Sequence, residues 1–288
     1  MKVLWFEVSV PSKYTNSKKP IAGWQDSLEN IVRQSKAFDI YIAFEGSIGD
    51  QVKVIDGITY IPIIDKKTFI DRQKDKISWE SSRNRLIPLA LSVIKKVSPD
   101  IIHVFGSEWC WGQVQKDVQI PVVIHMQGSM PPYFNAHYPP GYSELDIIKS
   151  YGFNLKKQFN GWLSRKKEKT WVQQEEKTLR TVSYYMGRTK WDHTIVKLYN
   201  PQAKYFYCSE ALRPSFVESK DSWCKTNRHK VKLITVGAST FWKGLDTILK
   251  TAHILKMRNF NFEWNICGNM PLQSLVENKE CLKFADNH

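Results

Sequence analysis

The sequence predicts an α/β fold that begins with a mostly parallel, doubly wound β-sheet and ends with a second, incomplete unit of the same kind. Short apolar segments alternate with helical patterns through residues 1–217, as in parallel strands joined by helical crossovers. Ile101–Phe105 is a continuous apolar run, as expected for a strand covered on both faces. A polar, charged segment over residues 218–230 is interpreted as a linker to residues 231–288.

The strands of the first part are predicted from short apolar runs and from turn residues. The pair Asp56-Gly57 lies between two such runs and is a strong hairpin signal. We expect strands at Val3–Val10, Ile40–Phe44, Val52–Ile55, Thr59–Ile63, Ile101–Phe105, Pro121–His125, Val182–Tyr185 and Ala203–Tyr207.

The helices of this part are predicted from apolar residues at helical spacing. One helix is opened by Gly23, and a later one ends at Lys95-Lys96, before Pro99. Thr189 is in position to cap the helix Lys190–Tyr199. The polar segment between the hairpin and the second helix, Lys66–Glu80, is expected to be a mobile loop. The inward-facing residues of the first two helices are Trp24, Leu28, Ile31 and Val32, and Ile87, Ala90, Leu91 and Ile94.

The second part opens with a strand, a turn and a helix. The strand Lys232–Val236 is ended by Gly237, and Lys243 precedes the helical apolar pattern. Unpaired backbone N–H groups at a helix start carry positive partial charge and favour a phosphate. Lys243 is therefore either part of a phosphate site or a solvated residue that opens an ordinary helix. A strand at Phe262–Cys267 and a helix over Asn269–Asn278 are expected to follow.

The composition points to an anionic partner and a reducing compartment. The chain has 288 residues, a net charge of +14 and a pI near 9.4, which suit a phosphate-bearing substrate, an acidic lipid surface or a nucleic acid. Its five cysteines are scattered and include no CxxC pair, so we expect reduced thiols, a cytoplasmic location and no metal site. No apolar run approaches the roughly 20 residues that span a bilayer.

The carboxyl ends of the strands, where doubly wound sheets bind their ligands, contain one notable histidine. His125 ends its strand and is followed by Gln127 and an aromatic, proline-rich loop, Met130–Tyr142. An imidazole there is either a proton-transfer or binding group or a structural residue. His103 lies within its strand and is expected in the core. Gly23 either brings backbone close to a ligand or simply opens its helix.

Two basic features have a functional and a structural alternative. Arg188 follows a strand and is placed for a bidentate contact with a phosphate or carboxylate, or else for an interdomain salt bridge. The segment Leu155–Lys177 is a basic helix with interleaved aromatic residues, which suits an anionic membrane surface or a solvated face packed through its aromatics.

The chain resembles the GT-B glycosyltransferases, in particular the retaining sugar-nucleotide transferases of family 4 (group 1). The segments that carry the resemblance extend from one end of the chain to the other: AGWQDSLENIV, DIIHVFGSEW, PVVIHMQGS, GRTKWD with NPQAKYFYCSEALRPSF, and LITVGASTFWKGLDTILKTA. The resemblance implies two Rossmann-like domains that face a cleft, the first holding the acceptor and the second the sugar nucleotide. It also implies catalysis without a metal.

The same resemblance assigns roles to particular residues. His125 matches the histidine that the family places close to the transferred sugar, and Lys243 matches the lysine that contacts the donor diphosphate. Gly23 matches the loop that approaches this diphosphate from the first domain. Gly237 and Ser239 belong to the turn expected to offer backbone N–H groups to it. Gln127 and Arg188 would lie on the acceptor side of the cleft.

Two departures from the family pattern affect this expectation. Ala238 stands where the family has an arginine, so phosphate binding would depend on Lys243, backbone N–H groups and Arg188. The family's pair of glutamates eight residues apart is missing, and residues 231–288 are fewer than the roughly 100 to 150 residues of a full domain. Glu277 and Glu280 have the wrong spacing. We therefore expect a truncated second domain, with the activity of this chain uncertain.

Two functions follow as alternatives. The first is a glycosyltransferase of the hexosyltransferase type that moves a sugar from a nucleoside diphosphate sugar, its co-substrate, to a saccharide or lipid-linked acceptor in surface polysaccharide or glycoconjugate assembly. Peripheral contact with the inner face of an anionic membrane is compatible with it. The second is a non-catalytic basic module that binds nucleic acid or anionic membrane. No nucleic-acid-binding motif occurs and the basic residues are dispersed, which argues against nucleic acid.

Overall fold

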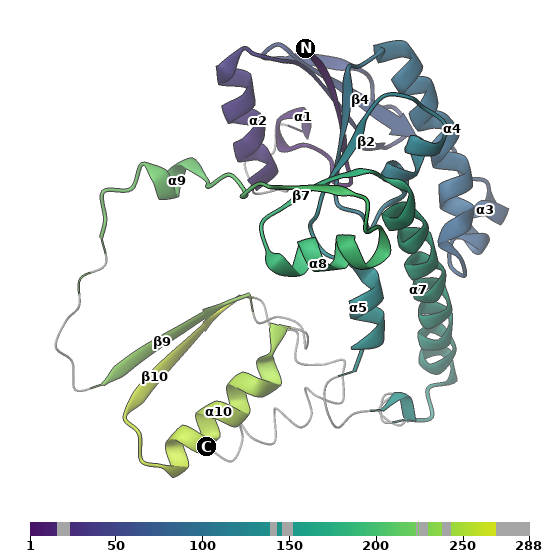
Figure 1. Ribbon diagram of the computed structural model, residues 1–288. Helices are drawn as coiled ribbons and strands as arrows, with labels where there is room; N and C mark the ends of the chain where they lie inside the picture. The colour runs from purple at the N-terminus through teal and green to yellow at the C-terminus, as the bar shows by residue number, and fades with distance from the viewer. Residues whose placement is uncertain are drawn as a thin grey trace. The chain divides into compact units, whose positions relative to one another are not determined.

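The computed structural model in Figure 1 describes residues 1–15, 24–138, 143–145, 152–222, 224, 230–237 and 243–268. The chain divides into two compact units. The first unit comprises Met1–Asn135 and Trp162–Lys220, and the second comprises Ala136–Gly161 and Asp221–His288. None of the described helices is both long enough and apolar enough to cross a bilayer.

An eight-stranded sheet forms the centre of the first unit, in the order β3-β4-β2-β1-β5-β6-β7-β8. All neighbouring strands are parallel except β3 and β4, which form the hairpin predicted at Asp56-Gly57. The strands are β1 Lys2–Glu7, β2 Asp39–Gly46, β3 Lys53–Ile55, β4 Ile58–Ile64, β5 Ile101–Phe105, β6 Val122–His125, β7 Tyr184–Gly187 and β8 Lys204–Tyr207. The predicted doubly wound α/β sheet is thereby confirmed.

Helices cover both faces of this sheet (Figure 1). Alternate residues of each strand point to opposite faces, so Leu4 and Phe6 pack in one core cluster while Val3 and Trp5 pack in the other. The helices of the unit are α1 Ser12–Thr15, α2 Trp24–Ser35, α3 Phe69–Lys74, α4 Trp79–Val97, the 3-10 helix η1 Cys110–Lys116, α5 Met130–Asn135, α7 Leu155–Thr181, which begins in the second unit, α8 Lys190–Tyr199 and α9 Pro214–Val217.

The two core clusters assign the helices to the faces. Residues of α4, η1, α7 and α8 pack on one face, and residues of α1 and α2 pack on the other. Both histidines of the central strands, His103 in β5 and His125 in β6, alternate with residues of the first cluster and therefore lie on the α2 face. Trp24, at the start of α2, packs against His125 from that side.

Several predicted boundaries are wrong. The segment Lys66–Glu80 contains α3 and the start of α4 instead of a loop. Thr68 caps α3, with its Oγ1 accepting the Asp71 N–H (3.1 Å) while the Asp71 carboxylate accepts the Thr68 N–H (2.9 Å). Arg85 of α4 then pairs with Asp65 and Asp75 and ties the segment to the sheet. The helix α3 was not predicted from its polar sequence because capping hydrogen bonds and ion pairs stabilise it.

Smaller corrections concern the ends and faces of elements. The first strand ends at Glu7 instead of Val10, and Ile31 of α2 is 54% exposed instead of inward-facing. The loop expected over Met130–Tyr142 begins with the short helix α5. The strand expected at Val182–Tyr185 lies two residues later, at Tyr184–Gly187, because Thr181 still belongs to α7.

Among its described residues, the second unit has a parallel pair of strands connected by a helix, in addition to the start of α7. β9 Val231–Val236 pairs with β10 Phe262–Cys267, and α10 Leu245–Met257 connects them. Leu245 and Ile248 of the helix are buried. The helix expected over Asn269–Asn278 lies outside the described residues.

Candidate functional site

The chain changes direction in the sheet between β1 and β5. From β1 it proceeds outward through β2 and β4, and it then returns to β5 on the other side of β1. Ligands of such sheets bind at the carboxyl ends of the strands beside this point. A cavity of about 340 Å³ lies there, lined by Ser9 after β1, Gln25 of α2, Gly106 and Glu108 after β5, and Gln127 after β6. Its position is that of a ligand site.

His125 ends β6 on the same edge of the sheet and is almost completely buried. Its ring lies 5.6 Å from that of His103, nearly parallel, and 4.9 Å from that of Trp24. Burial, reinforced by the Arg188 guanidinium, lowers the pKa of His125 to about 4. Neither ring nitrogen has a hydrogen-bond partner among the described residues. The imidazole is therefore uncharged at neutral pH, and both of its nitrogens are buried.

Gln127 connects His125 with the cavity. Its Oε1 accepts a hydrogen bond from Trp24 Nε1 (3.2 Å), and Trp24 is the residue that packs edge-on against His125. Its Nε2 donates to the main-chain carbonyl of Met126 (3.2 Å). The amide also lines the cavity. The structure thus brings together two of the residues that the sequence predicted, His125 and Gln127.

Arg188 follows β7 and is the third predicted residue near this edge. Its backbone N–H and that of Thr189 donate to Asp192 Oδ2 (3.1 and 3.0 Å), in the capping box that begins α8. Its guanidinium forms an ion pair with Glu210 (2.6 Å), and 38% of the side chain remains exposed. Arg188 and Glu210 both belong to the first unit, so their ion pair is not the interdomain salt bridge considered above.

Two glutamates beside the cavity were not predicted. Glu175 of α7 is buried and accepts hydrogen bonds from Ser107 Oγ (2.7 Å) and the Met130 N–H (2.5 Å). It thereby joins the segments that follow β5 and β6, and burial raises its pKa to about 7. The sequence offers no signal for this role, because Glu175 lies within a highly charged helix.

The second of these, Glu108, lies against two glycines. Burial raises the pKa of its carboxyl group, while the backbone N–H groups of Glu108, Ser107 and Gly128 oppose this rise. A Cβ at Gly106 would collide with its Oε2, and a Cβ at Gly128 would lie 2.7 Å from its Oε1. Gly106 also has a φ of +83°, which few other residues adopt. A methyl group at either position would therefore force the carboxylate to move.

Two of the remaining predicted residues, Gly237 and Lys243, are described and belong to the second unit. Gly237 ends β9 with a φ of +81°, and its N–H donates to the Cys267 carbonyl (2.9 Å). Lys243 is exposed and lies two residues before α10. Gly23 and Ser239 lie outside the described residues. In the described part of the chain, no three His, Cys, Asp or Glu side chains are grouped as they would be to hold a metal ion.

Solved structures resemble the whole chain, although no protein-family model and no curated protein matches it. Sucrose-phosphate synthase from Thermosynechococcus elongatus aligns over 99% of this chain and 67% of its own, with 9% identity and a TM-score of 0.54. UGT71G1 of Medicago truncatula, solved with UDP-glucose, aligns over 99% and 69%, with 9% identity and a TM-score of 0.43. MurG of Acinetobacter baumannii aligns over 99% and 63%, with 13% identity and a TM-score of 0.42.

At these identities the likeness concerns the fold. The eight-stranded sheet, its strand order and the first of these alignments agree: the chain has the α/β Rossmann-like parallel sheet of GT-B glycosyltransferases.

Proposed function

We propose that this chain is a glycosyltransferase that moves a sugar, of the hexose type, from a nucleoside diphosphate sugar to a saccharide or lipid-linked acceptor. We also propose that it belongs with the retaining enzymes of family 4 and serves surface polysaccharide or glycoconjugate assembly. The observation that carries the proposal is the uncharged, buried His125 at the carboxyl end of β6, next to a cavity at the point where the strand order reverses.

Each predicted residue would have its own role in binding the donor and in catalysis. Lys243 and the backbone N–H groups at the start of α10 would neutralise the charge that develops on the departing diphosphate, an electrostatic form of catalysis. The turn at Gly237 and Ser239, and the loop of Gly23, would add backbone N–H groups. His125 would contact the transferred sugar through a neutral ring nitrogen, since a charged imidazole is disfavoured where it lies.

The acceptor would enter from the cavity side of the first unit. Gln127 offers an amide there, and Arg188 offers a guanidinium that is partly exposed. The parallel sheet that this chain shares with sucrose-phosphate synthase supports a glycosyltransferase, so a nucleotide sugar is the class of ligand to be tested first.

The experiment that tests the function measures donor chemistry directly. The purified chain is incubated with UDP-glucose, GDP-glucose, ADP-glucose or dTDP-glucose. Release of the nucleoside diphosphate is followed with and without added saccharides. Release from one donor above that of a His125→Ala variant supports the proposal. If no donor is bound, as judged by calorimetry, and none is hydrolysed, the proposal is wrong for this chain.

Contact with an anionic membrane is the second part of the proposal. Phe153, Leu155 and Phe159 are all more than half exposed at the start of α7. Lys156 and Lys157 are exposed between them. Apolar side chains flanked by lysines are the combination that binds the headgroup region of an acidic bilayer. Such contact would bring the chain to lipid-linked acceptors.

A further inference from the structure

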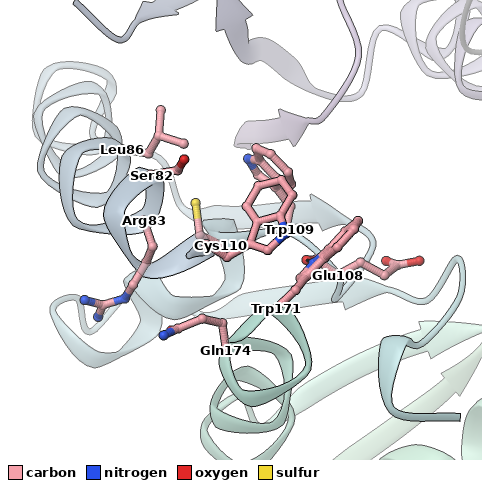
Figure 2. Close-up of a pocket in the computed structure, with 9 residues that line it drawn as sticks. Ser82, Arg83, Leu86, Glu108, Trp109, Cys110, Trp171 and Gln174 are labelled. Carbon is pink, nitrogen blue, oxygen red and sulfur yellow. Dashed lines mark hydrogen bonds between the residues drawn. The ribbon is translucent and has the colours of Figure 1, made fainter. Parts of the chain in front are cut away.

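The cavity beside β1 and β5 has a wall of two tryptophans whose rings are held in place. Trp109 Nε1 donates to Glu45 Oε1 (3.1 Å), and Trp171 Nε1 donates to the main-chain carbonyl of Glu108. Trp79 packs against both rings, with centroid distances of 4.3 Å to Trp109 and 4.6 Å to Trp171. Figure 2 is a close-up of a smaller neighbouring pocket that shares Trp109, Trp171 and Glu108 with this cavity, and it shows these three side chains together, away from Arg83.

Fixed indole rings are a favourable surface for a ligand with a flat apolar face. They lose little conformational freedom on binding because hydrogen bonds and packing already restrict them. The face of an indole is electron-rich and attracts C–H groups that carry slight positive charge. The axial C–H groups on one side of a pyranose ring provide such a face.

The remaining lining is polar but contains no cation. Ser9, Gln25 and Gln127 offer one hydroxyl and two amides, each able to donate and to accept, and Glu108 contributes a carboxyl group. None of the described residues that line the cavity is Lys or Arg, although the whole chain has a charge of +14. Two further carboxyl groups, both largely withdrawn from water, lie behind the lining. Glu45 bonds to Trp109, and Glu175 bonds to Ser107, between the lining residues Gly106 and Glu108.

We propose that this cavity binds a pyranose ring of an uncharged saccharide acceptor, with one face of the ring against Trp109 and Trp171 and its hydroxyls on Gln25, Gln127 and Ser9. A volume of about 340 Å³ lies within the range of small-molecule sites, which begins at roughly 300 Å³. The role of the bound sugar as an acceptor rests on the function proposed above, whereas recognition of the sugar ring itself does not.

The same lining disfavours the two obvious alternatives. A lipid chain would cover the amides and the carboxyl group without replacing their hydrogen bonds to water, at a cost of about 1–3 kcal/mol for each group. A uronic acid or sugar phosphate would lose water from its anionic group and find carboxyl groups in place of a cation. The specificity therefore comes partly from what the cavity rejects.

Saturation-transfer NMR on the full chain, without any nucleotide sugar, tests the proposal. The probes are the methyl glycosides of glucose, mannose and galactose, each beside the methyl glycoside of the corresponding uronic acid, with cyclohexanol as an apolar ring of similar size. We expect saturation transfer to at least one neutral glycoside, roughly tenfold weaker binding of its uronic acid, and no competition from cyclohexanol. Binding of cyclohexanol alone, or of the uronic acids equally well, would overturn it.

Two substitutions locate the binding. Trp109→Leu should weaken the neutral glycoside roughly tenfold, whereas Trp191→Leu, on the exposed part of α8, should leave it unchanged. Gln25→Lys adds the missing cation on a partly exposed helix and should reduce the preference for the neutral sugar over its uronic acid. This variant keeps the proposal testable if Trp109→Leu folds poorly. An unchanged preference in Gln25→Lys would place the sugar elsewhere and contradict the proposal.

The outcome is separate from that of the donor experiment. Sugar binding without donor hydrolysis would leave this inference standing and remove the glycosyltransferase proposal for the chain. Donor hydrolysis without any binding of the neutral glycosides would support the glycosyltransferase proposal and contradict this inference.

Discussion

Glu175 accepts a hydrogen bond from Ser107 across 68 positions of the sequence, with 2.7 Å between Oε1 and Oγ. The other oxygen of the same carboxylate accepts the N–H of Met130 at the start of α5. One side chain of α7 therefore fixes the segments after both β5 and β6, and these segments carry Glu108 and Gln127 to the cavity. The shape of the candidate site depends on this buried carboxyl group.

The first prediction concerns the stability that this arrangement provides. In Glu175→Gln one oxygen can still accept from Ser107, but the amide NH₂ would face the Met130 N–H, so two donors would meet. We expect a loss of about 1–3 kcal/mol in the free energy of unfolding, measured by denaturation in urea. Glu168→Gln, on a more exposed turn of the same helix, serves as the control and should change it by less than about 0.5 kcal/mol. Equal effects would mean that the bridge contributes nothing.

The second prediction concerns the pH dependence of stability. The pKa of Glu175 is raised from 4.5 to about 7 in the folded chain, so the folded state binds this proton more tightly than the unfolded state. Its contribution to stability is therefore greatest below pH 4.5 and declines as the pH rises to about 7, by up to about 3 kcal/mol.

The histidines act in the opposite direction. The pKa of His125 is lowered to about 4 and that of His103 to about 3, so these residues reduce stability as the pH falls below 6.5. The effect of Glu175 must therefore be read as the difference between the wild-type chain and Glu175→Gln across this range. A difference that does not vary with pH would refute the assignment.

The third prediction concerns the charge of His125. Burial beside Trp24 and His103 keeps the imidazole neutral, so its ring proton signals should titrate with a midpoint near pH 4 instead of the ordinary 6.5. NMR of the chain with labelled histidine provides the measurement, and His125→Phe assigns the signal while retaining an aromatic ring. A midpoint for His125 near the ordinary pH 6.5 would contradict the burial of its ring.

The fourth prediction concerns donor binding in the second unit. Lys243→Ala removes the cation at the start of α10 and should weaken binding of the preferred nucleoside diphosphate by about 10- to 100-fold in calorimetry, as expected for a hydrogen bond between charged groups. Lys250→Ala, farther along the same helix, is the matched control and should change it less than about threefold. If both variants bind as the wild type does, Lys243 has no role in holding the phosphates.

The fifth prediction concerns the membrane. The chain should sediment with vesicles of phosphatidylcholine and phosphatidylserine, and much less with phosphatidylcholine alone, because the lysines require an acidic surface. Phe159→Ser combined with Lys156→Glu and Lys157→Glu should reduce binding at least roughly tenfold. Phe216→Ser, which changes an even more exposed phenylalanine in α9, should not reduce binding. Unaltered binding by the triple variant would exclude this end of α7 as the contact.

The strands and one capping box were predictable because their signals are local. Ile101–Phe105 and Phe262–Cys267 have the predicted limits. The first is a mostly apolar run and the second alternates apolar and polar residues, and each is preceded by a polar residue and followed by a glycine. Thr189 caps α8 as expected because the Thr189 and Asp192 spacing lies within one turn. The prediction of a loop over Lys66–Glu80 is wrong because the same kind of spacing, Thr68 with Asp71, also starts a helix in a polar segment.

The site was predictable only where position along a strand determined it. His125 and Gln127 lie at the carboxyl end of a strand, which topology alone marks as a ligand edge. Trp171 and Glu175 reach the same edge from a helix that crosses the sheet far along the chain, and no local pattern connects them with Glu108 or Ser107. Contacts of this kind are decided by packing, which the order of residues does not reveal.

Gly106 and Gly128 could help to classify homologous sequences. Because the Glu108 carboxylate occupies the space that a methyl group would need at either position, the three residues should be inherited together. A relative in which one of the glycines is replaced should have a displaced or substituted glutamate, and the lining of its cavity should differ. These three positions could therefore serve to sort homologous sequences into those that keep this cavity lining and those that have changed it.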